Sequence, residues 1–242
     1  MAFEQQGKYR VRIAETVDDV RRAQALRWRS FRGGEGVDAD PFDAGARHVL
    51  IEEARSGRLV CCYRLIAADG SEIAGSYSAQ FYDLSALADY PGPMLELGRF
   101  CVAPGERDPA VLRLAWGALA DHVERHRVEL VFGCSSFRGI EPEIYADAFA
   151  LLKERHLAPR RWLPRVKAPS VFRYARRLRE RPDPKAAMRA MPPLLRIYLA
   201  LGGWVSDHAV VDRDLGTLHV FTGLEIGAVP AARARFLRAA AS

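Results

Sequence analysis

The sequence predicts an α/β protein in which a mixed β-sheet is flanked by helices. Over the first 157 residues, apolar runs typical of strands alternate with helical patterns in the order strand, helix, three strands, helix, strand, helix. Strands joined by a tight turn should pair antiparallel, and strands separated by a helix should pair parallel. A chain of 242 residues is also long enough to bury a sizeable core.

The first half of the chain contains most of these elements. Residues 9–13 (YRVRI) alternate as a strand does, and helical spacing begins after Thr16, which can cap a helix. Residues 32–45 are rich in Gly and Asp and should form a loop. Two strands then meet at a turn around Ser56-Gly57, and MLELGRFCV at 94–102 is the next strand.

The second half begins with a helix whose N-cap is Asp108, followed by Pro109 in its first turn. A strand at 128–137 and a helix at 140–156 follow. Beyond them lie a basic, aromatic stretch, an apolar helical stretch broken by Pro192-Pro193, one or two strands and a short Ala/Arg-rich helix at the end. We therefore expect a core of residues 1–157 and an extension, residues 158–242, that completes the fold.

The charge of the chain favours an acidic partner. The net charge is +6, and residues 154–181 contain ten Lys or Arg against two Glu. With Trp162, Phe172 and Tyr174 interleaved, and with the apolar stretch 194–204, this basic tract suits peripheral contact with an anionic membrane or docking of an acidic carrier protein. The alternative is a solvated basic face beside a core helix. No helix-turn-helix, zinc-finger or RNP signature accompanies the charge, so nucleic acid is not an expected partner.

Cysteine and histidine spacing predicts no metal site. The four cysteines form no C-x-x-C pair and read as small buried hydrophobes. The six histidines include one i, i+4 pair, His122 and His126, but its sequence, HVERH, is not the H-E-x-x-H zinc motif. The first residues lack the apolar segment of a signal peptide, and no run of about 18 apolar residues occurs. We expect a cytoplasmic protein, either free or in peripheral contact with the inner face of the cytoplasmic membrane.

Glu96 and Arg99 place two charges in the apolar strand 94–102. On a regular strand they would point to opposite faces, but a bulge at Gly98 would turn them to the same side. A carboxylate beside a guanidinium stays ionised, and with a free backbone N–H it suits attack of an amine on a carbonyl. The alternative is a buried ion pair at a sheet edge, and the residues alone leave both open.

Three further groups of charges are candidates. The acidic loop Asp38, Asp40 and Asp43 would bind a metal or a cationic substrate, or would simply be solvated. Arg64 interrupts an apolar strand, so it faces solvent or pairs with one of these aspartates. Arg27, by its helical position, reads as a surface charge.

Taken in order, RWRSF, DADPFDAGARHVLI, CCYRL and MLELGRFCV resemble the autoinducer-synthase branch of the GNAT acyltransferases. The later segments VELVFGCSSFRG and PPLLRIYLALGGWVSDHAVVDRDLGTLHVF are similar to its ornithine N-acyltransferases in particular. The resemblance implies a GNAT fold and transfer of a fatty acyl group, typically 3-hydroxyacyl, from acyl carrier protein to the α-amine of L-ornithine, giving lyso-ornithine lipid. It implies no cofactor beyond the acyl-phosphopantetheine of the donor.

The resemblance also assigns residues. Its motif positions are Arg27, Phe31, Asp40, Asp43, Arg64, Glu96 and Arg99. We expect Glu96 to act as general base, with the backbone of Gly98 and Arg99 polarising the thioester carbonyl. We expect Arg27, Phe31, Asp40, Asp43 and Arg64 to bind the substrate, and Cys101, Val102 and Arg107 to bind the donor.

The donor site departs from the pattern common in GNAT enzymes. The segment APGERDPAV after the charged strand has one glycine, Gly105, where many of these enzymes have a glycine-rich turn for the coenzyme A pyrophosphate. This favours a carrier-protein donor. The alternatives are an acyl-homoserine-lactone synthase, which would consume S-adenosylmethionine, and an acyltransferase acting on lysine, glutamine or glycine.

Overall fold

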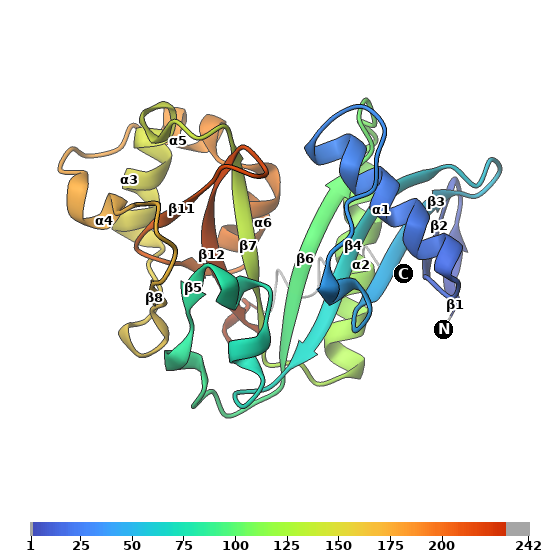
Figure 1. Ribbon diagram of the computed structural model, residues 1–242, viewed down its shortest axis with the longest axis horizontal. Coiled ribbons are helices and arrows are strands. Elements are labelled where there is room, and N and C mark those ends of the chain that lie inside the picture. Colours follow the sequence, from blue (N-terminus) through green and yellow to red (C-terminus); the bar gives the residue numbers. More distant parts are fainter. Residues whose placement is uncertain (1, 231–242) are drawn as a thin grey trace. The chain divides into compact units, whose positions relative to one another are not determined.

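The computed structural model describes residues 2–230 and divides into two compact units, each built from separate stretches of the chain (Figure 1). Unit 1 contains residues 2–67 and 95–128, and unit 2 contains residues 68–94 and 129–230. Each unit has its own strands and its own buried apolar cluster.

The sheet of unit 1 has the strand order β1-β2-β3-β4-β6. The strands are β1 (Ala2–Gln6), β2 (Tyr9–Ile13), β3 (Arg47–Glu53), β4 (Leu59–Ala68) and β6 (Met94–Val102). Strands β1 to β4 pair antiparallel with their neighbours. Gly57, in the turn between β3 and β4, has a φ of +70°, which a glycine adopts without strain, so the predicted hairpin is confirmed.

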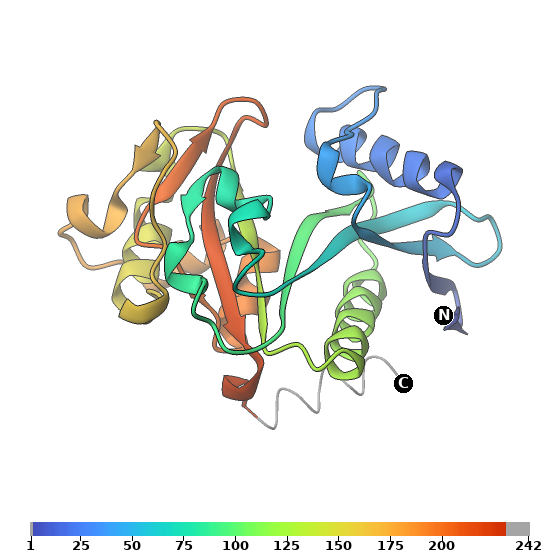
Figure 2. The same ribbon diagram turned by 60° about the horizontal axis from the view of Figure 1, so that its bottom comes forward.

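Two capped helices cover opposite faces of this sheet, α1 (Val17–Phe31) and α2 (Pro109–Arg125) (Figures 1 and 2). The Thr16 side chain accepts a hydrogen bond from Asp19 N–H, and Asp108 caps α2, as predicted. Successive side chains of β4 point to opposite faces of the sheet, so neighbouring residues contact different helices. Cys62 packs against α1, whereas the Tyr63 hydroxyl donates a hydrogen bond to Ala115 O of α2 at 3.0 Å.

The sheet of unit 2 is built around β7 (Leu130–Arg138) and β12 (Thr217–Glu225), which pair antiparallel over their whole length. The one or two strands expected near the end of the chain are β11 (Ala209–Asp212) and β12, which also pair antiparallel. Short strands complete the unit: β9 (Val171–Phe172) pairs with β11, β10 (Trp204–Val205) with β12, and β5 (Tyr82–Asp83) with β8 (Arg165–Val166).

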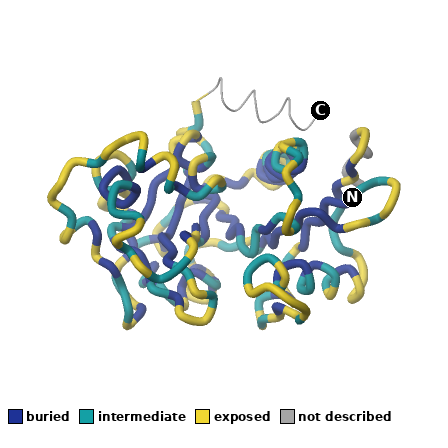
Figure 3. Tube along the Cα trace, turned by 90° about the horizontal axis from the view of Figure 1, so that it is seen from above, coloured by how far each residue is buried: buried dark blue, intermediate teal, exposed yellow. Residues whose placement is uncertain are grey.

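A helix and a segment made mainly of 3₁₀ turns pack on the sheet of unit 2. Helix α3 (Ala146–Arg155), preceded by a 3₁₀ turn at Pro142–Tyr145, packs Phe149 against Phe137 of β7, with ring centroids 4.9 Å apart. Residues 68–94 were not predicted as an element; they form 3₁₀ turns and β5, and bury Tyr82 against Phe221. Most residues of the strands are buried, and Figure 3 shows where the exposed residues lie along the chain trace.

The basic and apolar stretches of unit 2 form short helices: α4 (Tyr174–Arg177), α5 (Pro184–Ala190) and α6 (Pro193–Ala200), with 3₁₀ turns at Arg160–Trp162 and Ile226–Ala228. The break at Pro192-Pro193 is confirmed. Helix α6 buries Leu195, Tyr198 and Leu199, and Trp162, Phe172 and Tyr174 of the basic tract are also buried. These side chains therefore belong to the core of unit 2.

The Ala/Arg-rich helix expected at the C-terminus lies outside the described residues. Among residues 2–230, no helix combines the length and the apolar character needed to cross a bilayer.

An ion cluster, formed around the buried Glu52, lies between α1 and the first strands of unit 1. The Glu52 carboxylate, 1% exposed, lies 2.8–2.9 Å from guanidinium nitrogens of Arg10, Arg12 and Arg22. Burial alone would raise the pKa of Glu52, but the hydrogen bonds from Arg12 and Arg10 outweigh it and hold the pKa at about 2.

This lowered pKa predicts acid-labile stability. Because folding lowers the pKa of Glu52 from 4.5 to about 2, its contribution is complete above pH 4.5 and is lost as the pH falls toward 2. Its size is up to about 3 kcal/mol. Denaturant unfolding at several pH values should show stability falling more shallowly between pH 4.5 and 2 in Glu52→Gln than in the wild type. Equal slopes would contradict the role of this carboxylate.

Candidate active site

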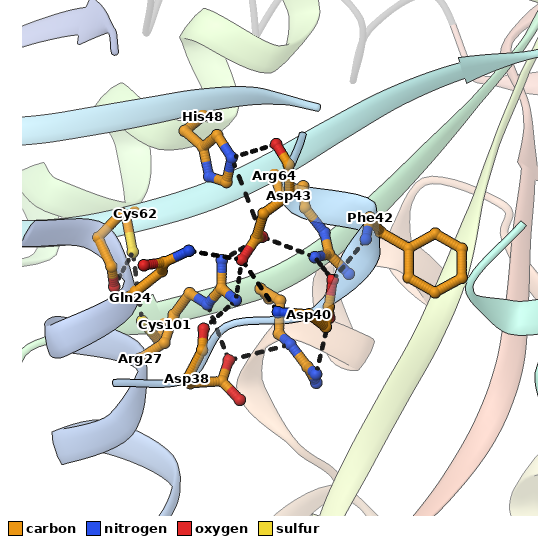
Figure 4. Close-up of polar contacts among 12 residues, drawn as sticks. Gln24, Arg27, Asp38, Asp40, Phe42, Asp43, His48, Cys62, Arg64 and Cys101 are labelled. Carbon is orange, nitrogen blue, oxygen red and sulfur yellow. Dashed lines mark hydrogen bonds and ion pairs between the residues drawn. The ribbon is translucent and has the colours of Figure 1, made fainter. Parts of the chain in front are cut away.

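Six charged side chains of unit 1 meet in one buried group, which we call the arginine–aspartate cluster (Figure 4). They come from helix α1, the loop after it, and strands β4 and β6. Its members are Arg27, Asp38, Asp40, Asp43, Arg64 and Arg99.

Every aspartate of the cluster is shared by two arginines. Asp38 lies 2.8 Å from Arg27 Nε and 3.1 Å from Arg99 Nε. Asp43 lies 2.8 Å from Arg27 Nη1 and 2.8 Å from Arg64 Nη1. Asp40 bridges Arg64 Nη1 and Arg99 Nη2, the latter at 3.0 Å. Three guanidinium groups and three carboxylates therefore cancel in formal charge.

The loop sequence explains how three acids reach one point. Pro41–Asp43 forms a single 3₁₀ turn capped by Asp40, which accepts a hydrogen bond from Phe42 N–H at 2.9 Å. Before the turn, Gly36 lies so close to the Trp28 ring that a Cβ would come within 2.3 Å of a ring atom. The loop is thus held at both ends, and only glycine fits at position 36.

Burial of the cluster corrects the reading of Arg27 and decides between the alternatives left open for Arg64 and for the aspartates. Arg27 and Arg64 are each 1% exposed, so Arg27 is not a surface charge, and Arg64 pairs with aspartates rather than facing solvent. Asp38 and Asp43 are buried, so they are not solvated acids. Burial opposes ionisation of Asp43, but hydrogen bonds from Arg27, Gln24 and Arg64 outweigh it and hold its pKa well below the usual range.

Two residues that sequence reasoning missed support the cluster. Gln24 Nε2 donates to Asp43 Oδ2 at 2.8 Å, and His48 Nε2 lies 3.1 Å from Asp43 O. Burial lowers the pKa of His48, which keeps its ring neutral at neutral pH. Gln24 lies three residues before Arg27 on helix α1, and His48 lies directly opposite Arg64 in the pairing of β3 with β4. These two spacings are the features of the sequence that could have predicted that Gln24 and His48 lie near the cluster.

Strand β6 carries the proposed catalytic residues. Glu96 is 2% exposed. The backbone is unusual at Arg99, whose φ is +53°, and not at Gly98, which is absent from the positive-φ residues. The distortion expected from the glycine thus lies one residue later. The catalytic roles of Glu96, Gly98 and Arg99 stay predictions.

The expected donor residues follow on β6 and in the next turn. Cys101 is buried against α1, with its Sγ 3.6 Å from that of Cys62, and Phe31 of α1 packs on the same apolar cluster. Val102 O accepts a hydrogen bond from the Ser30 hydroxyl at 3.2 Å, and Arg107 is exposed. Their binding roles stay predictions. Within residues 2–230, no group of His, Cys, Asp and Glu side chains is arranged to hold a metal ion.

Comparison with known proteins identifies the family. The model of the acetyltransferase (GNAT) domain matches residues 26–117, which include the whole cluster. The L-ornithine N(alpha)-acyltransferase of Rhodobacter capsulatus is 36% identical over 229 residues, covering 88% of each chain. The chain belongs to the L-ornithine N(alpha)-acyltransferase family. A second family member, from Brucella abortus, is 33% identical over 91% of this chain and 85% of its own.

A solved structure extends the comparison to the fold. The N-acyl amino acid synthase FeeM from uncultured soil microbes superposes with a TM-score of 0.50, covering 91% of this chain and 92% of its own, at 9% sequence identity. Together with the family match, this confirms the predicted GNAT-type α/β fold for this member of the ornithine acyltransferase family.

Proposed function

We propose that the protein transfers a 3-hydroxyacyl group from acyl carrier protein to the α-amine of L-ornithine, with Glu96 as general base. The observation that carries this proposal is membership of the L-ornithine N(alpha)-acyltransferase family. The matches to the two family members, at 36% and 33% sequence identity, extend over most of this chain and most of theirs. The nitrogen of the neutral amine bonds to the thioester carbon, the C–S bond breaks, and phosphopantetheine leaves as a thiolate. The amine proton passes to Glu96, directly or through water, and from there to the thiolate sulfur, which gives the free thiol.

The acidity of amines explains the choice of nitrogen. An α-amino group has a pKa of about 8, whereas a side-chain amine like that of lysine has a pKa of about 10.4. A single carboxylate therefore deprotonates the α-amine more readily. The δ-ammonium of ornithine needs a counter-charge, and Asp40 suits it best because, at 15% exposure, it is the most accessible carboxylate of the cluster. Arg64 or Arg27 would meet the substrate carboxylate or brace the acids.

The start of helix α2 supports a carrier-protein donor over coenzyme A. A helix N-terminus binds phosphate through free N–H groups, but here Asp108 occupies the cap and accepts from Ala110 N–H, and Pro109 has no N–H. The Asp108 carboxylate would also repel a pyrophosphate. The single phosphate of a carrier protein can instead meet the exposed Arg107.

The basic tract supplies a docking surface for an acidic carrier protein. Its arginines and lysine are exposed, whereas the aromatic side chains between them are buried and so do not reach a membrane interface. The exposed residues are Arg155, Arg160, Arg161, Arg165, Lys167, Arg173, Arg176, Arg177, Arg179 and Arg181.

Charge reversal tests this surface. Arg160→Glu/Arg165→Glu should raise the KM for the acyl carrier about tenfold, with kcat unchanged, because docking is steered by charge. The matched control reverses two exposed arginines of unit 1, Arg55 and Arg113, and should leave KM unchanged. Equal KM values for both variants would contradict the docking surface. Binding to vesicles with anionic lipid, lost only in the first variant, would assign the tract to a membrane instead.

The reaction itself is tested with purified protein and L-ornithine. A 3-hydroxyacyl carrier protein should give acyl-ornithine at a kcat/KM at least about 100-fold above that of the same acyl group on coenzyme A. Comparable values for both donors would refute the carrier assignment, and no acyl-ornithine from either donor would refute the reaction.

A further inference from the structure

Arg99 is held in a conformation that its residue type disfavours. Its φ of +53° lies in the left-handed region, where a Cβ meets the following carbonyl oxygen. It sits inside strand β6, whose other residues have no positive φ. A left-handed residue within a strand occurs in one class of β-bulge, and it turns the adjacent peptide groups out of the strand pattern.

The side chain of Arg99 is tied at two points. Its Nε lies 3.1 Å from Asp38 Oδ2 and its Nη2 lies 3.0 Å from Asp40 Oδ2, and the side chain is 11% exposed. Charge-assisted contacts of this kind are stronger than neutral ones, so they can offset the cost of the backbone conformation.

The two anchoring acids are themselves fixed. Asp38 is bound by Arg27, and its N–H donates to Gln24 O at 3.1 Å. Asp40 is bound by Arg64 and accepts from Phe42 N–H within the 3₁₀ turn. The anchors therefore stay in place independently of Arg99.

We infer that Asp38 and Asp40 are positioning residues for acyl transfer: through the guanidinium of Arg99 they hold its backbone in the left-handed conformation, which aims a β6 peptide N–H at the thioester oxygen. This rests on the proposed function. In this arrangement the guanidinium acts on its own backbone, and the peptide N–H stabilises the oxyanion that forms when the amine attacks.

Three substitutions at position 99 separate the backbone from the charge. Arg99→Gly, Arg99→Asn and Arg99→Ala all remove the guanidinium, but the left-handed conformation is easiest for glycine, tolerated by asparagine and disfavoured for alanine. We expect kcat with ornithine to be highest for Gly among the three variants, at least about tenfold lower for Ala, and intermediate for Asn. The KM for ornithine should be the same in all three.

Two results would overturn the inference. Equal, severe loss of kcat in all three variants would show that the guanidinium acts on the substrate. Equal, near-normal kcat would show that this conformation does not matter. Absence of acyl-ornithine in the wild type would instead refute the proposed function, and the Tm values would still test the backbone: Arg99→Gly should melt above Arg99→Ala.

Asp38→Asn tests the coupling to Arg99, because Asp38 contacts the Arg99 guanidinium and has no proposed contact with ornithine. It should lower kcat about tenfold in the wild-type background but less than threefold in the Arg99→Gly background, since the glycine no longer needs the anchor. An equal loss in both backgrounds would contradict the inference.

Gly98→Ala is the matched control that tests whether the strained backbone of β6 is at Arg99 and not at Gly98. A Cβ at position 98 would meet Arg64 Nε at 3.7 Å, an ordinary contact, and its φ lies outside the left-handed region. Its Tm should stay within a few degrees of wild type. Unfolding of Gly98→Ala but not of Arg99→Ala would mean that the glycine is the constrained residue.

Discussion

Glu96→Gln is expected to lower kcat by about 10²–10⁴-fold while leaving the KM for the acyl carrier nearly unchanged. The glutamine amide keeps the size of the side chain but cannot take a proton from the α-amine. Glu96 is buried on the strand that carries the left-handed Arg99, so a base there lies next to the unusual backbone. Steady-state kinetics with ornithine and a 3-hydroxyacyl carrier protein measure both parameters.

Glu52→Gln is the matched control for this substitution. Glu52 is also a buried glutamate of unit 1, but it pairs with Arg10, Arg12 and Arg22 and lies outside the arginine–aspartate cluster and strand β6. Its replacement should cost stability and leave kcat near wild type at neutral pH. A kcat for Glu96→Gln close to that of Glu52→Gln would remove Glu96 from the mechanism.

Asp43→Asn is expected to cause the largest loss of stability, about 3–5 kcal/mol. Asp43 binds Arg27 and Arg64, which are both buried, and also accepts from Gln24 Nε2 and from Asp40 N–H. A neutral side chain would leave two buried guanidinium groups without full compensation, and would loosen the 3₁₀ turn. Denaturant unfolding should show a lower free energy of unfolding, together with reduced acyl transfer.

Asp121→Asn provides the contrast. Asp121 forms an i,i+4 pair with Arg125 at 2.8 Å on the surface of α2, where the Arg125 side chain is 51% exposed. Such pairs contribute about 0.3–0.5 kcal/mol, so its replacement should change stability little. A similar effect for both substitutions would contradict the central place of Asp43 in the cluster.

Local signals in the sequence predicted the elements because they act over a few residues. Thr16 and Asp108 are helix caps, and Gly57 is a turn residue, so each specifies its own neighbourhood. Residues 68–94 have no such periodicity, because they form short 3₁₀ turns that depend on packing against a sheet assembled from later residues.

The cluster could be predicted only in part. The resemblance brought four of its six members, Arg27, Asp40, Asp43 and Arg64, into one substrate site, and Arg99 into the catalytic group. Residue patterns alone read Arg27 as a surface charge, because one arginine on a helix does not reveal three aspartates ten or more residues later. The sequence likewise predicted the backbone distortion of β6 at its glycine, Gly98, because glycine is the residue type common at such sites. The left-handed residue is Arg99, whose conformation depends on contacts that sequence spacing does not show.

The most direct test of this account is tandem mass spectrometry of the product formed by the purified protein from a 3-hydroxyacyl carrier protein and an equimolar mixture of ornithine, lysine, glutamine and glycine. The account predicts that N-acyl-ornithine predominates, with the acyl group on the α-nitrogen and the δ-amine free. Acylation of the δ-nitrogen, preference for another amino acid, or formation of a lactone only when S-adenosylmethionine is supplied would contradict it.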